Sequence, residues 1–272
     1  MSSPSQNGKA ASAKAVSRQE QRHRLVTEAV MTAGSVAIED LARMFDVSVM
    51  TIHRDLDRLE AQNVLRKARG VATALPSSTV ESNDAYRRAQ QRDEKRDLAA
   101  AALAFIQPGQ TVMLDDSTTV LPLLDMLATK APLTVASNSL SVISGLVDAE
   151  EIELVGVGGE FRAWCNAFMG QMTLDAIAAL HADVLLMSTS AVTGAACYHQ
   201  NQDTISIKRA LIAAAESSVL LVDHTKFERR ALFRLCALAD FDHVVVDAGT
   251  PSATVDALRQ HHGSVTVAPH SS

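Results

Sequence analysis

The chain has 272 residues, of which 47% are hydrophobic and 21% are charged. This length exceeds the usual size of one domain, so two domains are expected, with ample sequence for a buried core. No run of 18 or more apolar residues occurs, and residues 1–21 lack the apolar middle of a signal peptide. The composition therefore predicts a soluble globular protein of the cytoplasm with no membrane partner.

The net charge of −6 is unevenly distributed along the chain. Residues 1–75 carry 11 Lys and Arg against 8 Asp and Glu, whereas residues 98–272 carry 9 against 18. A basic head on an acidic body suggests that only the head meets a polyanion.

The three cysteines are Cys165, Cys197 and Cys236, which are far apart in the sequence and lack C-x-x-C spacing. This pattern argues against a disulfide framework and against a structural zinc site. Small buried hydrophobic side chains are their expected role. The sequence predicts no metal site and no cofactor.

Residues 1–17 are rich in Ser, Ala, Lys and Gln, a composition typical of a disordered tail. Residues 18–75 then show the pattern of a winged helix-turn-helix domain. Apolar side chains recur at helical spacing between residues 25 and 45. Ser48 is expected to cap a helix that begins at Val49, because its hydroxyl can accept a backbone N–H. Two short helices joined by a three-residue turn form a helix-turn-helix, whose second helix presents its first residues outward.

The letters HRDL at 53–56 are those of a protein kinase catalytic loop, which raises the question whether Asp55 is a catalytic base. That loop needs an Asn where Glu60 stands here. The 52 residues before it contain no G-x-G-x-x-G, so there is no room for an ATP-binding lobe. The apolar spacing instead indicates an amphipathic DNA-recognition helix. Its inner face is expected to consist of Ile52, Leu56 and Leu59.

Two short β-prone pieces follow around Arg66 and Gly70 and are expected to pair as a basic wing. Such a hairpin lies along a phosphate backbone or enters a minor groove. Double-stranded operator DNA is the expected partner, with Arg54 as the first candidate for a base contact. The residues predicted to contact DNA are Ser48, Val49, Met50, Thr51, His53, Arg54, Arg58, Lys67 and Arg69.

Residues 76–97 are predicted to be a linker that leads into one charged connecting helix, with the helical pattern running on to about residue 106. Residues 98–272 alternate apolar β-type runs with Ala- and Leu-rich helices. This alternation indicates an α/β domain with a mostly parallel sheet buried on both faces. We expect this domain to bind an effector and to form oligomers. The expected strands are 111–115, 133–137, 152–158, 183–188, 218–223, 243–247 and 264–268.

Ligands of an open parallel sheet bind beyond the carboxyl ends of its strands. The run from Asp115 to Thr119 lies there, between a strand and an expected helix. Hydroxyls and N–H groups at a helix start suit a phosphate, although Ser and Thr can equally be present to cap that helix. Adjacent strand residues point to opposite faces, so Asp115 and Asp116 are not expected to share one ion.

Asp115 is assigned to the hydroxyls of a sugar, and the role of Asp116 is left open. Lys208 is expected at the start of a helix. The predicted effector-binding residues are Asp115, Ser117, Thr118, Thr119, Asn138, Gly159, Arg162, Lys208 and Lys226.

The chain from about Arg22 to Asp247 resembles the DeoR family of bacterial transcriptional regulators. Residues 39–72 are similar to the family's helix-turn-helix and wing, and the carboxyl part is similar to its sensor domain. The resemblance implies a sensor fold related to ribose-5-phosphate isomerase and the coenzyme A transferases. It also implies an effector that is a phosphorylated sugar or related metabolite and that alters operator affinity. Matches in the sensor part are 115–119, 138–139, 158–159, 168–170, Lys208 and 223–226.

Three places depart from the family pattern. His53-Arg54 stands where two Arg are common, and Asp116-Ser117 replaces the usual Ser-Gly of the phosphate loop. Thr204 and Ser206 occupy the region in which members carry a Glu just before the late Lys.

Three functions follow from these patterns. The first and preferred one is a ligand-controlled repressor of sugar or polyol catabolism genes, without catalytic residues and acting as a dimer or tetramer. The second is a sugar-phosphate isomerase-like enzyme with a DNA-binding head, in which Asp115 and Lys226 would move a proton. The missing late-helix Glu argues against it. The third is a DNA-binding protein whose α/β body serves only oligomerisation.

Overall fold

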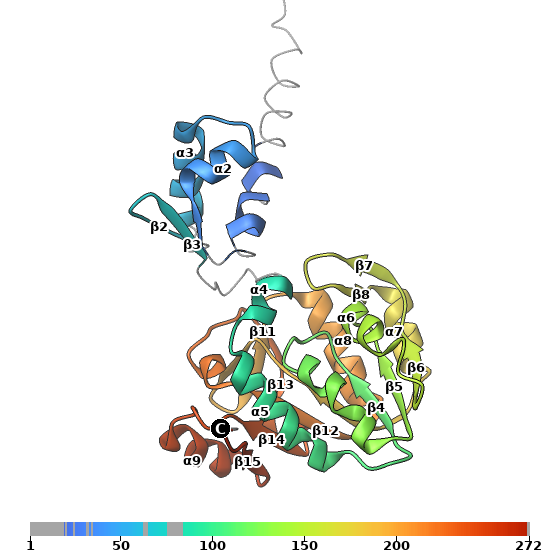
Figure 1. Ribbon diagram of the computed structural model, residues 1–272. Coiled ribbons are helices and arrows are strands. Elements are labelled where there is room, and N and C mark those ends of the chain that lie inside the picture. The colour runs from blue at the N-terminus through green and yellow to red at the C-terminus, as the bar shows by residue number, and fades with distance from the viewer. Residues whose placement is uncertain are drawn as a thin grey trace, which may run out of the picture. The chain divides into compact units, whose positions relative to one another are not determined.

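The chain divides into two compact units, Met1–Ser77 and Ser78–Ser272 (Figure 1). The expected disordered tail at 1–17 and the first part of the expected linker, 76–83, lie outside the described residues. Among the residues described, no helix has the length and apolar character needed to cross a bilayer. The structure, a computed structural model, describes residues 19, 21–23, 25–30, 33, 35–61, 65–74 and 84–270.

The first unit is a winged helix-turn-helix, as the sequence predicts. Residues 25–30 are helical and precede β1 (Ser35–Ala37), α2 (Ile38–Met44) and α3 (Val49–Ala61). The predicted wing is the antiparallel hairpin of β2 (Leu65–Ala68) and β3 (Val71–Ala74), and β1 pairs with the other edge of β3. The core of this first unit is formed by buried aliphatic side chains, among them Val26, Val30, Ile38, Leu41, Ile52, Leu56, Leu59 and Leu65.

A two-residue turn at Arg69-Gly70 closes the wing. Both residues have a positive φ, of 50° and 79°. Turns of this kind match the right-handed twist of the strands they join, and Gly adopts such a φ without steric strain. The turn therefore carries Arg69 to the tip of the hairpin.

The second unit begins with α4 (Asp84–Ala89) and α5 (Arg92–Ala102), where the sequence pattern predicts one continuous helix. Gln91 has a left-handed φ of 48°, which interrupts the helix between them. Leu98, Ala99 and Ala102 of α5 are fully buried, so α5 belongs to the core of this unit.

A seven-stranded sheet forms the centre of the second unit, in the order β15-β14-β12-β9-β4-β5-β6. Every neighbouring pair is parallel. All seven predicted strands are present, with ends shifted by a few residues. They are β4 (Thr111–Leu114), β5 (Leu133–Ser137), β6 (Ile152–Gly156), β9 (Ala182–Met187), β12 (Ala215–Val222), β14 (His243–Val246) and β15 (Val265–Val267).

Helices cover both faces of this sheet, which explains why its strands are apolar without alternation. Val112 and Leu114 of β4 pack on one side with Leu98, whereas Met113 packs on the other with Leu211. The first side is covered by α5, η1 (Leu103–Phe105), η2 (Leu121–Asp125), η3 (Leu127–Lys130) and α6 (Leu140–Leu146). The second is covered by α7 (Gln171–Ala178), α8 (Gln202–Ala213) and α9 (Ser252–His261).

Two small antiparallel sheets of the second unit were not predicted. One pairs β7 (Glu160–Arg162) with β8 (Ala167–Met169). The other has the order β10-β11-β13, formed by β10 (Ala191–Thr193), β11 (Ala196–His199) and β13 (Phe233–Ala237), with η5 (Leu238–Asp240) after it.

This second small sheet places Cys197 opposite Cys236, although they are far apart in the sequence. Both are free thiols, and Cys197 is buried while Cys236 is half-buried. The neighbouring Cys236 and burial together raise the pKa of Cys197 well above its ordinary value. The expectation of small buried side chains holds for Cys165 and Cys197.

The strand order reverses between β4 and β9. The chain runs from β4 outward to β5 and β6, and then returns to place β9 on the opposite side of β4. Loops that leave β4 and β9 in opposite directions open a crevice at their carboxyl ends, the usual ligand position in such sheets.

Candidate functional site

Ser48 caps α3, as predicted. Its Oγ accepts a hydrogen bond from the backbone N of Thr51 at 3.2 Å and lies 2.8 Å from Thr51 Oγ1. The first turn of α3 is left at the surface, with Val49 42% and Met50 68% exposed. This is the part of a recognition helix that meets base edges.

The cations of α3 lie on its outer side. Arg54 and Arg58 are four residues apart, which places them on one face, and both are exposed. His53 is half-buried, as is Thr51. Because Ile52, Leu56 and Leu59 point inward, this outer face offers guanidinium groups to a polyanion.

Asp55 is a structural residue on the inner side of α3. Its carboxylate accepts hydrogen bonds from Arg22 Nε at 2.6 Å and Nη2 at 3.1 Å, and His23 Nε2 lies 2.8 Å from it. Burial would raise the pKa of Asp55, but Arg22 and His23 outweigh it and lower the pKa. The carboxylate therefore fastens the recognition helix to the helical segment that contains Arg22 and His23, which answers the question raised by the HRDL letters.

The wing is attached to α3 through Lys67, a residue of β2. Lys67 Nζ forms an ion pair with Asp57, and the backbone N of Lys67 donates to Glu60 Oε1 at 2.8 Å. Arg69 at the tip is exposed. Of the two predicted wing contacts, Arg69 is presented to solvent, whereas the Lys67 ammonium holds the hairpin against α3.

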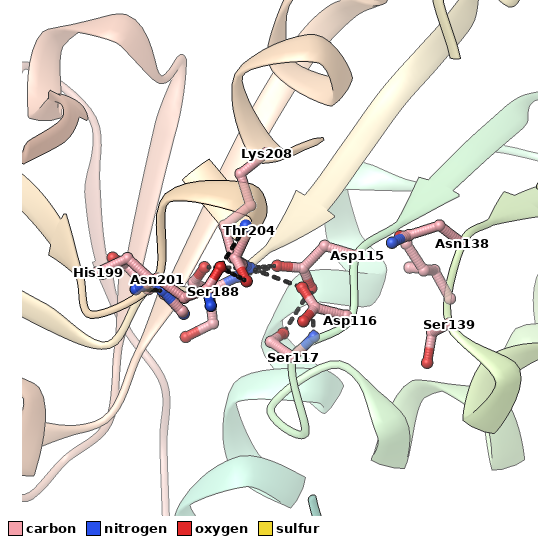
Figure 2. Close-up of polar contacts among 12 residues, drawn as sticks. Asp115, Asp116, Ser117, Asn138, Ser139, Ser188, His199, Asn201, Thr204 and Lys208 are labelled. Carbon is pink, nitrogen blue, oxygen red and sulfur yellow. Dashed lines mark hydrogen bonds and ion pairs between the residues drawn. The ribbon is translucent and has the colours of Figure 1, made fainter. Parts of the chain in front are cut away.

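In the second unit, polar side chains gather where the switch point predicts them. Asp115 and its neighbours follow β4, and Asn138 and Ser139 follow β5 (Figure 2). Ser188 follows β9 on the other side of Asp115. The structure thus brings together five predicted effector residues, all buried: Asp115, Ser117, Thr118, Thr119 and Asn138.

Sequence reasoning missed the contribution of β9. The predicted strand 183–188 ends in Ser188, and the next residues are Thr189 and Ser190, all buried at the same edge. The strand-end rule that selected Asp115 would have selected them too. His199 and Asn201, from β11 and the loop after it, had no signal in the sequence because β11 itself was not predicted.

The Asp115 carboxylate ties the loop after β4 to the loop after β9. Oδ1 accepts from the Ser117 backbone N at 3.0 Å and from Ser117 Oγ at 2.6 Å. Oδ2 accepts from the Ser188 backbone N at 3.2 Å and pairs with Lys208. These four contacts give Asp115 a structural task, and its predicted contact with sugar hydroxyls stays a prediction.

Lys208 was predicted to lie at the start of a helix. It lies instead about two turns inside α8. The helix begins at Gln202, where Asn201 Oδ1 accepts from the Thr204 backbone N at 3.0 Å and caps it. The pattern TISIKRA begins inside this helix, so its first residue does not mark the helix start.

The Lys208 ammonium is buried between two carboxylates. It pairs with Asp115, lies 3.2 Å from Asp116 Oδ1 and donates to the Ser188 carbonyl oxygen at 3.2 Å. Burial would lower the pKa of Lys208, but the two carboxylates outweigh it and raise the pKa. Asp115 and Asp116 meet at this one ammonium group, although adjacent strand residues point to opposite faces, because β4 ends at Leu114 and strand alternation stops there.

The segment after Thr119 differs from the expected helix. It forms two short 3-10 helices, η2 and η3, in place of an α-helix. Few aligned peptide groups follow the loop, so the helix dipole contributes little attraction to an anion here. Positive charge at this edge has to come from side chains.

A cluster of cations lies beside Thr118. Lys95 of α5 is buried, and its Nζ donates to Thr118 Oγ1 at 3.0 Å and to the Arg87 carbonyl oxygen. Burial and the nearby Lys226 lower the pKa of Lys95 to about 7. A small cavity of about 10 Å³ is lined by residues that include Arg87, Lys95, Thr118, Asp223, Lys226 and Arg229.

Lys226 is therefore brought to the loop after β4, as predicted. It belongs to η4 (His224–Phe227), and its Nζ lies 3.9 Å from Asp223 Oδ2. Sequence patterns offer no reason to include Lys95 or Arg87, because both fall in the segment that was predicted to be a linker and connecting helix. Their position shows that this segment contributes to the edge.

Two buried oxygens near the switch point have no hydrogen-bond partner among the described residues. They are Asn138 Oδ1 and Ser188 Oγ. Asn138 Nδ2 donates to the Phe168 carbonyl oxygen at 2.9 Å, which leaves only its oxygen unused. Buried polar atoms nearly always have a partner, so these two oxygens can still pair with a water molecule or a polar ligand.

Gly159 and Arg162 belong to a different group. They lie in or beside β7, and no hydrogen bond or ion pair of the described chain joins them to Asp115–Thr119. A Cβ at Gly159 would lie 2.0 Å from Thr173 Oγ1, so glycine is needed there for packing. Arg162 pairs with Glu160 at 2.9 Å.

A larger hollow of the described surface, about 710 Å³, lies at the opposite edge of the sheet. Its lining includes Glu150, Glu151 and Glu153. Three carboxylates repel an anion, so the smaller cationic edge is the better candidate for a phosphorylated ligand. Within the described residues, no group of His, Cys, Asp and Glu has the geometry of a metal site.

Comparison with known proteins agrees with this division of the chain. Residues 22–78 match the DeoR-like helix-turn-helix domain, and residues 90–248 match the DeoR C terminal sensor domain. The glycerol-3-phosphate regulon repressor of Escherichia coli (strain K12) is 32% identical, covering 90% of this chain and 97% of that protein. The L-fucose operon activator of Haemophilus influenzae is 28% identical, covering 88% and 96%.

Solved structures resemble the chain only weakly. Ribose 5-phosphate isomerase A from Methanocaldococcus jannaschii aligns with a TM-score of 0.38 at 16% identity, over 51% of this chain and 55% of that chain. A likeness at this level says nothing about chemistry. The sequence matches are decisive, because both domain families occur in order and the relatives align over nearly their whole length. They confirm the resemblance seen in the sequence: the chain belongs to the DeoR family of helix-turn-helix transcriptional regulators.

Proposed function

We propose that this protein is an operator-binding repressor of sugar or polyol catabolism genes, and that a phosphorylated sugar or polyol changes its affinity for DNA. The observation that carries the proposal is the cationic edge at the switch point of a chain that also holds an exposed recognition helix. A relative's name, glycerol-3-phosphate regulon repressor, supports this class of effector.

The DNA contacts are proposed for the outer face of α3 and the wing tip. We propose that Arg54 reads a base, since it is exposed one turn beyond the exposed first residues of α3. The first turn of α3 would meet base edges as well, and the exposed cations Arg58 and Arg69 would contact phosphates. A homo-oligomer, dimer or tetramer, would pair two such heads on a two-fold operator.

The effector is proposed to bind with its phosphate among the cations beside Thr118. Its hydroxyls would then reach the unused oxygens of Asn138 and Ser188, which are hydrogen-bond acceptors or rotatable hydroxyls. A ligand that spans these groups would be a short phosphorylated polyol or sugar. Asp116 is proposed to stay paired with Lys208.

Catalysis is not part of the proposal, nor is a cofactor. Proton abstraction needs a base with a free lone pair near the substrate. Asp115 has both oxygens occupied, and Lys208 is buried between two carboxylates that favour its charged form. We place the protein in the cytoplasm, where operator DNA and phosphorylated metabolites are both found.

An operator gel shift with a panel of phosphorylated sugars and polyols, glycerol 3-phosphate included, tests the proposal. At least one compound should change operator affinity by about fivefold or more, the lower end of allosteric coupling. The same panel is then assayed for turnover. Product formation well above background would favour the isomerase-like alternative. If no compound changes operator affinity, the α/β domain would be expected to serve only oligomerisation.

A further inference from the structure

Two cysteines that are far apart in the sequence face each other in the β10-β11-β13 sheet. Cys197 of β11 and Cys236 of β13 are paired residues of the antiparallel β11-β13 ladder. Both are free thiols, and their side chains hydrogen-bond to each other. Cys165, the third cysteine, donates instead to the Arg162 carbonyl oxygen at 3.5 Å. The fold therefore brings two of the three thiols into contact.

The pairing of β11 with β13 suits a covalent bond between these thiols. Residues directly opposite in an antiparallel pair have Cα atoms about 4.5–5.5 Å apart, and a disulfide spans about 4.4–6.8 Å. Their Cβ atoms lie about 4.5–5.5 Å apart, whereas a disulfide needs about 3.5–4.5 Å, so an approach of about 1 Å is required. The register shifts between Cys197 and Tyr198, and a strand bends at such an irregularity. A small movement of β11 at this place closes the distance.

The two thiols differ in their access to solvent. Cys197 is fully buried, whereas Cys236 is half-buried and lines a hollow of about 370 Å³ beside α8. Arg209, Arg234 and Asp240 line the same hollow, so a small polar oxidant can reach Cys236 there. The hydrogen bond with Cys236 and burial raise the pKa of Cys197, which keeps that thiol protonated and slow to react with an oxidant on its own.

We propose that Cys197 and Cys236 form an oxidative modification site, at which a hydroperoxide converts the two thiols into one disulfide. The Cys236 sulfur attacks the peroxide O–O bond and gives up its proton, which yields a sulfenic acid and releases one molecule of water or alcohol. The Cys197 sulfur then displaces the hydroxyl group from the Cys236 sulfur, and the Cys197 proton leaves with that hydroxyl as water. Each sulfur loses one electron, and the two peroxide oxygens together gain two.

The disulfide would join two strands that both contact α8. The strand β11 is followed by Asn201, whose side chain caps that helix, and Arg209 of the helix donates to the Leu235 carbonyl oxygen of β13 at 2.7 Å. Oxidation would therefore hold β11, β13 and α8 in one arrangement, and Lys208 belongs to the same helix. The site would form in the same way whether or not the protein is a repressor.

Peptide mapping of the full-length protein tests the site. The protein is treated with hydrogen peroxide, its remaining thiols are blocked with iodoacetamide, and a non-reducing digest is analysed by mass spectrometry. The expected product is a peptide pair joined through Cys197 and Cys236, which dithiothreitol separates again. Cys165→Ala is the matched control and should give the same pair in the same yield, because its thiol lies outside the β11-β13 ladder.

Variants separate the roles of the two thiols. In Cys197→Ala the sulfenic acid at Cys236 has no thiol to react with, so it should persist and be labelled by dimedone. In Cys236→Ser the buried Cys197 should react with peroxide at least about tenfold more slowly than Cys236 does in Cys197→Ala. Equal rates of dimedone labelling in the two variants would refute the proposed order of attack.

Amide hydrogen exchange compares the reduced and the oxidised wild type. A disulfide opposes the opening of the strands that it joins, so exchange at residues 196–199 and 233–237 should slow by about tenfold or more after oxidation. The same treatment should leave exchange in Cys236→Ser unchanged. The proposal is overturned if hydrogen peroxide leaves both thiols free, if Cys236 is found only as a sulfinic acid, or if the disulfide joins two chains.

Discussion

The head and the sensor edge present their cations in opposite ways. On α3, Arg54 and Arg58 are exposed, whereas at the sheet edge Lys95 and Lys208 are 4% and 2% exposed. Exposed charges attract a polyanion and are screened by salt. Buried charges act strongly, but only on a group that enters the site. The difference teaches that the head suits a large polyanion and the edge suits one small anion.

The edge contains a second contrast, between its two buried lysines. Lys208 already has two carboxylate partners, so its charge is committed to the fold. Lys95 has no carboxylate partner among the described residues, and its burial lowers the pKa of its ammonium group. The two lysines are similarly buried, but Lys208 stabilises the fold, whereas Lys95 remains available to an anion that enters the site.

The largest effect is expected for Lys208→Met. Two buried carboxylates would lose their cation, which should destabilise the sensor unit by about 3–5 kcal/mol. Urea denaturation followed by the fluorescence of Trp164, the single tryptophan, reports on this unit. Lys130→Met, half-buried at the end of η3, is the control and should stay within about 0.5 kcal/mol. Equal losses of unfolding free energy in the two variants would show that the carboxylate partners of Lys208 do not stabilise the sensor unit.

Asp55→Ala should destabilise the head by about 1.5–3 kcal/mol, because charged hydrogen bonds to Arg22 and His23 are lost. Amide exchange in α3 should then accelerate by about tenfold or more. A head whose α3 exchanges at the wild-type rate would show that Asp55 does not anchor the recognition helix.

The same carboxylate predicts a pH dependence. The folded pKa of Asp55 lies below the ordinary value of 3.8, so its stabilisation is complete above that value and is lost as the pH falls through the folded pKa. Amide exchange in α3, followed as the pH is lowered from 5 to 3, should show this loss in the wild type and not in Asp55→Ala. Parallel profiles would refute the assignment.

Arg54→Ala should leave stability unchanged, since its side chain is exposed. If Arg54 reads a guanine, discrimination between operator and random DNA should fall by about 1–3 kcal/mol. Fluorescence anisotropy with both DNAs separates the possibilities. Equal weakening on the two sequences would make Arg54 a phosphate contact.

The smallest effect is expected for Lys67→Met, which removes a surface ion pair with Asp57. The stability of the head should change by about 0.2–1 kcal/mol, measured by amide exchange in β2 and β3. Binding to random DNA should weaken less than in Arg69→Met, because only Arg69 is exposed. A larger loss for Lys67→Met would mean that Lys67 leaves Asp57 to contact DNA.

Continuous apolar runs were enough to predict all seven strands of the central sheet, because each is buried on both faces. The strand-end rule likewise found Asp115 and Asn138. The same reasoning placed Lys208 wrongly, because a helix cap at Asn201 precedes the pattern that was taken as a start. It missed Lys95, because a charged helix between two domains has the composition of a solvated connector, and only packing shows one of its lysines to be buried.

Operator affinity with and without the metabolite that acts most strongly, measured by fluorescence anisotropy for the wild type, Lys95→Met and Arg96→Met, tests the central claim most directly. Arg96→Met is the control, which removes an exposed cation one position along α5. The wild type and Arg96→Met should change affinity by about fivefold or more, and Lys95→Met by less than about twofold. A response in Lys95→Met as large as in the wild type would contradict the account in which the buried cations beside Thr118 bind the phosphate of the effector.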